Sequence, residues 1–141
     1  EEELKEINKR DEDDIKIDDI VYYKADKNTN NIIIDGSVFN NKKGNSEIFG
    51  ITVNEYGVYD ISIKMKSDLG PLAQLPLSIY YDNALKSTIT FRGTEGKYTT
   101  ETRPLGFVFG VNHYIKLYFG ADGLDIDKVE IILNEKAKVS F

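Results

Sequence analysis

Apolar and polar residues alternate along most of the chain after residue 15, which is the pattern of strands with one buried and one solvated face. The clearest alternation covers residues 59–66, where tyrosine, isoleucine and methionine interleave with aspartate, serine and lysine. Because residues two apart on a strand share a face, this segment predicts a strand that packs on a core. Other short strands are predicted at residues 15–23, 31–35, 47–53, 77–82, 87–91, 98–103, 105–109, 115–119 and 129–133.

Turn-forming residues separate these strands. A turn is expected at residues 54–57, an irregular surface loop at the glycine- and proline-containing residues 67–76, and another break at residues 93–96. Pro104 falls between two strand-like segments, and proline is tolerated at the edge of a sheet. Many short strands at this spacing, with no convincing helix beyond the first ten residues, predict an all-β domain, and we favour a β-sandwich over a small barrel.

The first 14 residues differ from the rest of the chain. Acidic side chains dominate them, and Leu4 and Ile7 are their only apolar residues. Such a segment cannot bury enough apolar surface to fold by itself, so it is interpreted as a solvated linker or a frayed helix. We therefore expect residues 1–14 to form a charged linker or tail, and residues 15–141 to form one β-sandwich domain with its own core.

Composition excludes several functions. The 141 residues include 24 acidic and 18 basic side chains, which give a net charge of −6 and no basic stripe, so nucleic acid is not an expected partner. There is no cysteine, and the single histidine, His113, stands in no nucleophile motif, which argues against a zinc site and against catalysis. No run of 18 apolar residues is present, so direct membrane insertion by this domain is not expected.

Two aspartates, Asp125 and Asp127, open the strand-like segment near the end of the chain with one isoleucine between them. Carboxylates two apart on a strand stand side by side and repel unless a cation or hydrogen-bond donors compensate them. This pair therefore indicates a metal or a polar ligand at the loop-bearing end of the sandwich. Calcium takes six to eight oxygen ligands, and the acidic, asparagine-rich turns of this chain offer many. The alternative is that these residues merely favour turns for local reasons.

The order of several motifs resembles the carbohydrate-binding modules of families 6 and 35, which are galactose-binding-like β-sandwiches of the jelly-roll type. The similar stretches lie between residues 49 and 133. They are residues 53–63 (VNEYGVYDISI), 96–100 (GKYTT), 110–119 (GVNHYIKLYF) and 123–131 (GLDIDKVEI). Residues 23–26 (YKAD) occupy the position at which these modules carry an alanine–acidic pair on the first strand.

The resemblance implies a set of site residues. In these modules an acidic residue of the first strand and an aspartate of the last strand bind a structural Ca²⁺, which corresponds to Asp26 and Asp127 here. The sugar cleft of family 6 uses an aromatic side chain and an asparagine, and the corresponding positions are Tyr98 and Asp125. Tyrosine replaces the usual tryptophan, and aspartate replaces the usual asparagine.

At a finer level, the acidic tail and the strands rich in Asn, Lys and Ile resemble the cell-binding component of clostridial binary toxins. This resemblance implies a secreted, extracellular, non-catalytic module for receptor recognition within a heptameric toxin. Its partners would be a host cell-surface glycan or receptor and the other domains of the toxin subunit. The alternative is a module appended to a secreted glycoside hydrolase, and a third interpretation is a structural spacer.

Overall fold

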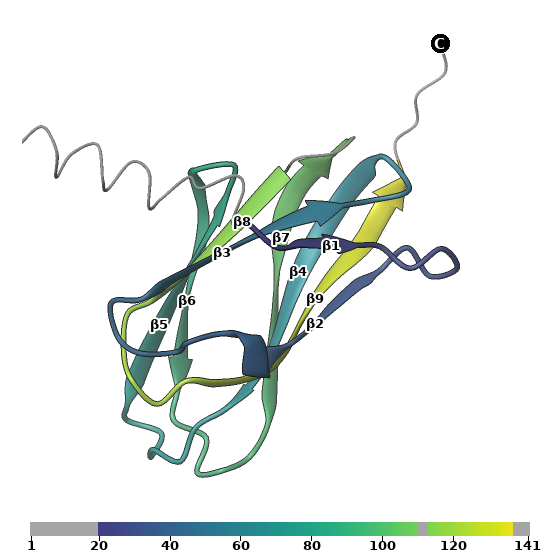
Figure 1. Ribbon diagram of the computed structural model, residues 1–141. Coiled ribbons are helices and arrows are strands. Elements are labelled where there is room, and N and C mark those ends of the chain that lie inside the picture. Colours follow the sequence, from purple (N-terminus) through teal and green to yellow (C-terminus); the bar gives the residue numbers. More distant parts are fainter. Residues whose placement is uncertain (1–19, 110–112, 137–141) are drawn as a thin grey trace, which may run out of the picture.

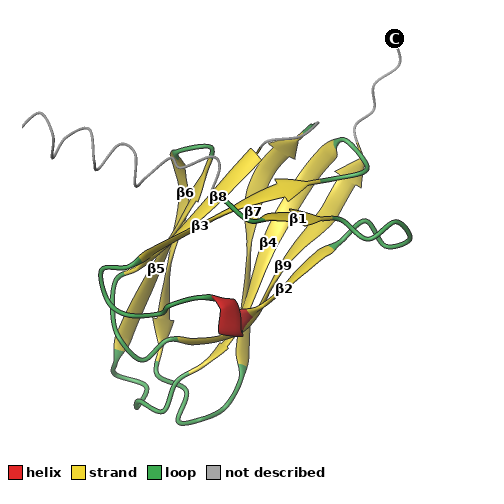
Figure 2. Ribbon diagram, viewed as in Figure 1, coloured by secondary structure: helices red, strands yellow, loops and turns green. Residues whose placement is uncertain are grey.

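The computed structural model describes residues 20–109 and 113–136, so the predicted tail at residues 1–14 lies outside the described part. Within it the chain forms strands and one short 3₁₀ turn (Figures 1 and 2). The elements are β1 (Tyr22–Lys24), β2 (Ile32–Asp35), η2 (Gly36–Val38), β3 (Ser46–Thr52), β4 (Gly57–Lys66), β5 (Gln74–Tyr81), β6 (Ala84–Arg92), β7 (Thr99–Val108), β8 (His113–Phe119) and β9 (Asp125–Lys136).

The strands build two sheets that lie face to face (Figure 1). One sheet has the strand order β1-β3-β8-β5-β6, and the other has the order β2-β9-β4-β7. All neighbouring strands are antiparallel except β1, which runs parallel to β3. The fold is therefore a β-sandwich of two mostly antiparallel sheets, which confirms the predicted all-β class.

Alternation on the strands places the core between the sheets. Every second residue of β4 is fully buried, and the intervening residues are partly exposed on the outer face, as the sequence predicts. Burying these side chains supplies most of the stabilisation, because burial contributes about 25 cal/mol per Å² of apolar surface. The largest completely buried side chains are Tyr59, Phe119, Ile32, Ile34, Ile51, Ile61, Ile63, Met65, Leu75, Leu77, Ile79 and Ile89.

Two proline-containing segments differ from the prediction. The irregular loop expected at residues 67–76 ends earlier, because β5 already begins at Gln74 and includes Pro76. The pairing of β5 with β8 starts one residue after Pro76, so no ladder bond is lost there. The two segments predicted around Pro104 form one continuous strand, β7, with a register shift against β4 at this point. As predicted, the strand with Pro104 lies at a sheet edge.

The same edge strand carries charges on its inner side. Glu101 and Arg103 of β7 pair with Ile63 and Ile61 of β4, so their side chains leave the sheet on the face of the core. An Arg103 Nη atom lies 2.9 Å from a Glu101 carboxylate oxygen, and both side chains remain partly exposed. This ion pair therefore lines the open side of the sandwich beside β7.

Loops gather at the two ends of the sandwich (Figure 2). The connections β2–β3, β4–β5, β6–β7 and β8–β9 lie at one end, which we name the Tyr98 end. The turns β1–β2, β3–β4 and β5–β6, together with the start of β8, lie at the other end, which we name the His113 end. A small ligand that binds to the loops therefore contacts either the Tyr98 end or the His113 end.

Candidate ligand-binding site

Tyr98 and Asp125, the two residues expected to contact a sugar, lie on the same rim of the four-stranded sheet. Lys66, the last residue of β4, pairs with Asp125, the first residue of β9. On the other side of β4, the Lys66 Nζ lies 5.4 Å and the Lys64 Nζ 4.7 Å from the centre of the Tyr98 ring. Tyr98 remains 53% exposed. The rim thus presents an aromatic ring on one side of β4 and a carboxylate on the other.

The carboxylate of Asp125 is held by the β2–β3 loop. The side-chain amide of Asn41 donates a hydrogen bond to Asp125 Oδ1 and another to the carbonyl oxygen of Leu124, both at 2.8 Å. Because one amide bridges backbone and side chain, it fixes the orientation of the carboxylate. Asp125 is nevertheless exposed, so its remaining lone pairs face solvent.

The negative charge of Asp127 is compensated by a lysine of β4. Its Oδ2 lies 3.7 Å from Lys64 Nζ. The register between β4 and β9 shifts next to Lys64, so Asp127 is the extra residue of a β-bulge. The repulsion that the sequence predicts between Asp125 and Asp127 is therefore relieved by an amide donor at the first carboxylate and an ammonium group at the second.

Asp26 lies at the His113 end, in the turn between β1 and β2. Its Oδ1 accepts hydrogen bonds from the backbone N–H groups of Thr29, at 3.0 Å, and Asn28, at 2.8 Å. These bonds favour the charged form, so they lower the pKa of Asp26, with Thr29 contributing most. The geometry is that of an aspartate that closes a local turn.

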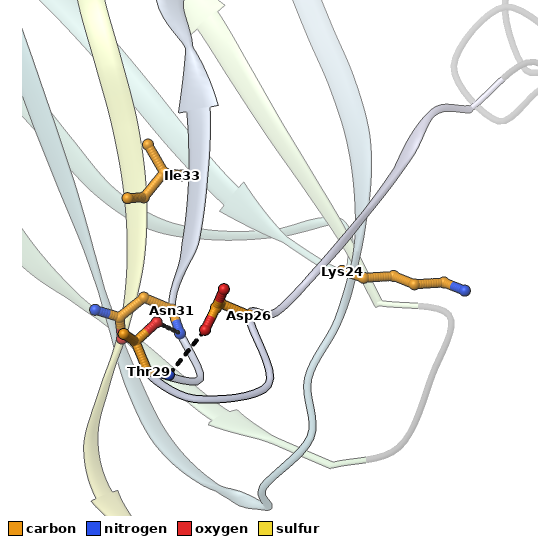
Figure 3. A pocket seen from close by; sticks show the side chains of 5 residues that line it. All are labelled: Lys24, Asp26, Thr29, Asn31 and Ile33. Atoms are coloured by element: carbon orange, nitrogen blue, oxygen red, sulfur yellow. Dashed lines mark hydrogen bonds between the residues drawn. The ribbon is translucent and has the colours of Figure 1, made fainter.

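A shallow pocket of about 410 Å³ adjoins this turn (Figure 3). The side chains of Asp26, Thr29 and Asn31 lie close together in it, whereas that of Lys24 extends away from them (Figure 3). Ile33, which is 62% exposed, supplies its apolar part. The pocket offers one carboxylate, whose Oδ1 already accepts two backbone hydrogen bonds.

The structure does not bring Asp26 and Asp127 together. Asp26 lies beside the start of β2, because it donates its backbone N–H to the carbonyl of Asn31, the residue before this strand. Asp127 lies beside the end of β2, because the next residue, Lys128, pairs with Asp35, the last residue of this strand. The four residues of β2 separate the two positions by roughly 13 Å at about 3.3 Å per residue. The cause is β1, which joins the five-stranded sheet and delivers its turn to the end where β9 finishes.

These residues therefore do not fit a calcium ion that bridges Asp26 and Asp127. Calcium requires six to eight oxygens, and each of the two carboxylates lies apart from the other. Among residues 20–109 and 113–136, no group of three or more His, Cys, Asp or Glu side chains could hold a metal.

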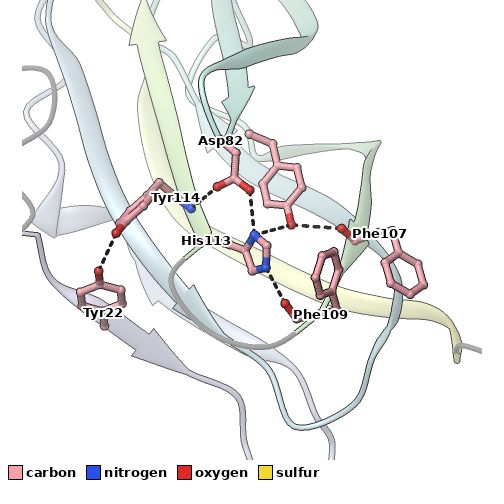
Figure 4. Close-up of polar contacts among 7 residues, drawn as sticks. Tyr22, Asp82, Phe107, Phe109, His113 and Tyr114 are labelled. Atoms are coloured by element: carbon pink, nitrogen blue, oxygen red, sulfur yellow. Dashed lines mark hydrogen bonds and ion pairs between the residues drawn. The ribbon is translucent and has the colours of Figure 1, made fainter.

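A second polar network, which sequence reasoning missed, occupies the His113 end (Figure 4). The Nδ1 of His113 lies 2.7 Å from Asp82 Oδ2 and 3.0 Å from the hydroxyl of Tyr81, and its Nε2 lies 2.6 Å from the carbonyl oxygen of Phe109. The other oxygen of Asp82 accepts the backbone N–H of Tyr114 at 2.8 Å. The partners of His113 thus come from the end of β5, from the turn that follows it and from the residue after β7, and these contacts hold the imidazole in place.

Exposed aromatic side chains surround this network. Tyr56 is 53%, Phe107 44% and Phe109 55% exposed. The ring centres of Tyr56 and Phe109 are 6.3 Å apart, and those of Phe107 and Phe109 are 5.7 Å apart. We name these three residues the aromatic surface. The available sequence signal was weak, because two phenylalanines near the end of a strand are ordinary β-sheet composition.

Known proteins share this fold. No protein-family model matches the chain. A β-glucosidase of Ruminococcus albus is 31% identical over 84 residues, which cover 57% of this chain and 9% of the enzyme. A β-glucosidase structure from Paenibacillus barengoltzii superposes with a TM-score of 0.61 at 20% identity, over 81% of this chain and 11% of the enzyme. The chain therefore spans about a tenth of the length of these enzymes.

Whole carbohydrate-binding modules also superpose. The C-terminal family 6 module of a laminarinase from Zobellia galactanivorans matches 73% of this chain and 99% of the module, with a TM-score of 0.61 and 16% identity. A module of a Cellvibrio mixtus lichenase, solved in complex with cellotriose, matches 74% of this chain and 78% of the module, with a TM-score of 0.54 and 18% identity. Family 35 modules share the fold as well. The structure thus has the fold of family 6 and 35 modules.

Proposed function

We propose that this chain is a non-catalytic glycan-binding module whose site is the rim formed by Tyr98 and Asp125. The observation that carries the proposal is the placement of these two residues on either side of β4, in a fold shared with carbohydrate-binding modules. A half-exposed tyrosine ring offers a flat apolar face to a pyranose ring. A carboxylate accepts hydrogen bonds from sugar hydroxyls.

The rim is arranged before any ligand arrives. Lys64 and Lys66 lie over the ring of Tyr98, and Asn41 orients the carboxylate of Asp125. Side chains that are already fixed lose little entropy on binding, which favours affinity. On this proposal the sugar stacks on the exposed part of the ring and directs hydroxyl groups toward Asp125.

Binding of cello-oligosaccharides and laminari-oligosaccharides, measured by isothermal titration calorimetry, tests the proposal. Tyr98→Ala should weaken binding about tenfold or more, because about 1.4 kcal/mol of lost contact corresponds to a factor of ten. Tyr118→Ala is the matched control, since Tyr118 is also exposed but lies on the outer face of the other sheet. Equal affinities for the two variants, or no binding to a broad glycan array, would contradict the proposal.

For the biological setting, we propose receptor recognition by the cell-binding component of a secreted binary toxin. The acidic tail and the strands rich in Asn, Lys and Ile support this setting. The partners would be a host cell-surface glycan or receptor and the remaining domains of a heptameric assembly. Tyr98-dependent binding of the domain to cultured host cells, lost after enzymatic removal of surface glycans, is the expected result.

The second candidate is a module that holds a secreted glycoside hydrolase on a polysaccharide. The similarity to a segment of the R. albus β-glucosidase favours it. The module would then be retained on insoluble polysaccharide and would not bind host cells. Fold alone does not fix function, so an experiment must separate the two settings. Retention on insoluble polysaccharide and binding to host cells should both be measured with the same preparation of the domain.

A further inference from the structure

The aromatic surface at the His113 end exposes three rings that come from separate segments. Tyr56 lies in the turn before β4, Phe107 lies in β7, and Phe109 follows β7. The pairing of Gly57 with Val108 brings these segments side by side. Large aromatic side chains that gather in the open, rather than in the core, usually mark a binding surface.

Hydrogen bonds from the opposite sheet hold this surface in place (Figure 4). The hydroxyl of Tyr81 donates to the carbonyl oxygen of Phe107 at 3.0 Å, and His113 Nε2 lies 2.6 Å from the carbonyl oxygen of Phe109. The ring of Phe109 also packs edge-on against the imidazole, with 5.5 Å between centres. Asp82 in turn fixes the imidazole. The exposed rings are thus pre-organised, which lowers the entropic cost of binding.

We propose that the aromatic surface is a second glycan site, which takes a neutral pyranose by stacking. The class of ligand rests on the proposed function, whereas the location rests on the geometry of this end of the molecule. The hydroxyl of Tyr56 and the half-exposed carboxylate of Asp82 supply polar partners at its border. In the described part of the chain, no lysine or arginine lies over these three rings, unlike Tyr98. The carboxylate of Asp82 disfavours a uronate or a sulfated sugar.

This surface and the Tyr98 rim lie at opposite ends of β4. The ten residues of β4 extend over roughly 33 Å at about 3.3 Å per residue, so one short oligosaccharide cannot reach both sites. Two sites on one module let it engage two chains, or two stretches of one chain. Simultaneous engagement raises the overall affinity for a polysaccharide above that for a short sugar, without any new contact.

The single histidine provides a specific reporter for the test. Since His113 is the only histidine in the chain, its ring proton resonances are unambiguous in an NMR spectrum. The ring touches Phe109, so a sugar that stacks on the aromatic surface should shift these resonances in a saturable way. Cellotriose and laminaritriose, which are too short to span both sites, are the probes, and each is titrated into the wild-type domain and its variants.

The expected pattern separates this proposal from the proposed function. Phe109→Leu keeps an apolar side chain, and Tyr56→Ala alters an exposed turn. Each should raise the Kd that is obtained from the shift of the His113 resonances roughly tenfold. Tyr98→Ala should leave that response unchanged while it weakens binding at the other rim about tenfold or more. The conservative Phe109→Tyr should retain the response.

Three results would overturn the second site. If neither sugar shifts His113 while Tyr98-dependent binding persists, only the Tyr98 rim binds glycan. If Tyr98→Ala abolishes the His113 response, the signal arises from one remote site. If the His113 resonances shift with protein concentration alone, and sedimentation shows a dimer, a second copy of the chain covers the aromatic surface instead. If Tyr98→Ala leaves all sugar binding unchanged while the His113 response persists, the proposed rim is contradicted and this site is supported.

Discussion

Tyr59→Phe removes one oxygen atom from the interior of the sandwich, and the structure allows the cost to be estimated. Tyr59 is fully buried. Its hydroxyl accepts a hydrogen bond from the amide of Asn30 at 2.6 Å and donates one to the carbonyl oxygen of Glu55 at 2.6 Å. Asn30 also accepts the backbone N–H of Asn54 at 3.1 Å. The phenol therefore ties the β1–β2 turn to the β3–β4 turn.

Without the oxygen, the buried amide of Asn30 loses its acceptor. A buried unsatisfied polar group costs about 1–3 kcal/mol, and the lost bond to Glu55 adds about 1 kcal/mol, so we expect the free energy of unfolding to fall by about 2–4 kcal/mol. For a domain of this size, this corresponds to a decrease in Tm of roughly 6–15 °C. Asn30 has a φ of 57°, a left-handed conformation that asparagine tolerates.

Urea and thermal unfolding, followed by circular dichroism, measure this change. Tyr118→Phe is the control, because it deletes the same atom from a side chain that is 39% exposed. An unchanged m-value would show that only stability differs. A loss below about 1 kcal/mol for Tyr59→Phe, or a loss equal to that of Tyr118→Phe, would refute the assignment of the hydroxyl as a tie between the two turns.

Two further predictions concern pH and metal. Burial raises the pKa of Tyr81 above its ordinary value, so the stabilisation from its neutral phenol is present below about pH 10 and is lost as the pH rises further. Tyr81→Phe should therefore lose less stability than the wild type between about pH 9 and 11.5 in equilibrium denaturation, and identical slopes would contradict this. Asp26 and Asp127 lie at opposite ends of β2, so they cannot share one calcium ion. We therefore expect the Tm measured in CaCl₂ and the Tm measured in EDTA to agree within about 1 °C in differential scanning fluorimetry. An increase of several degrees with calcium would contradict this and show that the folded domain binds calcium.

The sequence predicted those parts of the fold that depend on local alternation. The two faces of β4 follow directly from period-two patterning, and Pro104 correctly indicated an edge strand. Tyr98 and Asp125 border strands that pair with β4 on its two sides, so the structure places both residues on one rim. That this rim binds a sugar stays a prediction.

The parts that sequence reasoning missed depend on tertiary placement. Nothing local to Asp26 indicates that β1 runs parallel to β3 and carries this residue to the far end of β9. The network of His113 was equally hidden, since Asp82 is 31 positions away in the chain. Such contacts depend on strand order, which the pattern of a single strand does not encode.

The inward-facing charges of β7 have a consequence for crowding. A foreign strand that added itself to this edge would extend the sheet over Glu101 and Arg103 and cut off the water that now reaches them. Removing water from a half-solvated ion pair is unfavourable, so β7 resists edge-to-edge association. Many copies of the domain can therefore stand close together on one surface without joining their sheets through this strand.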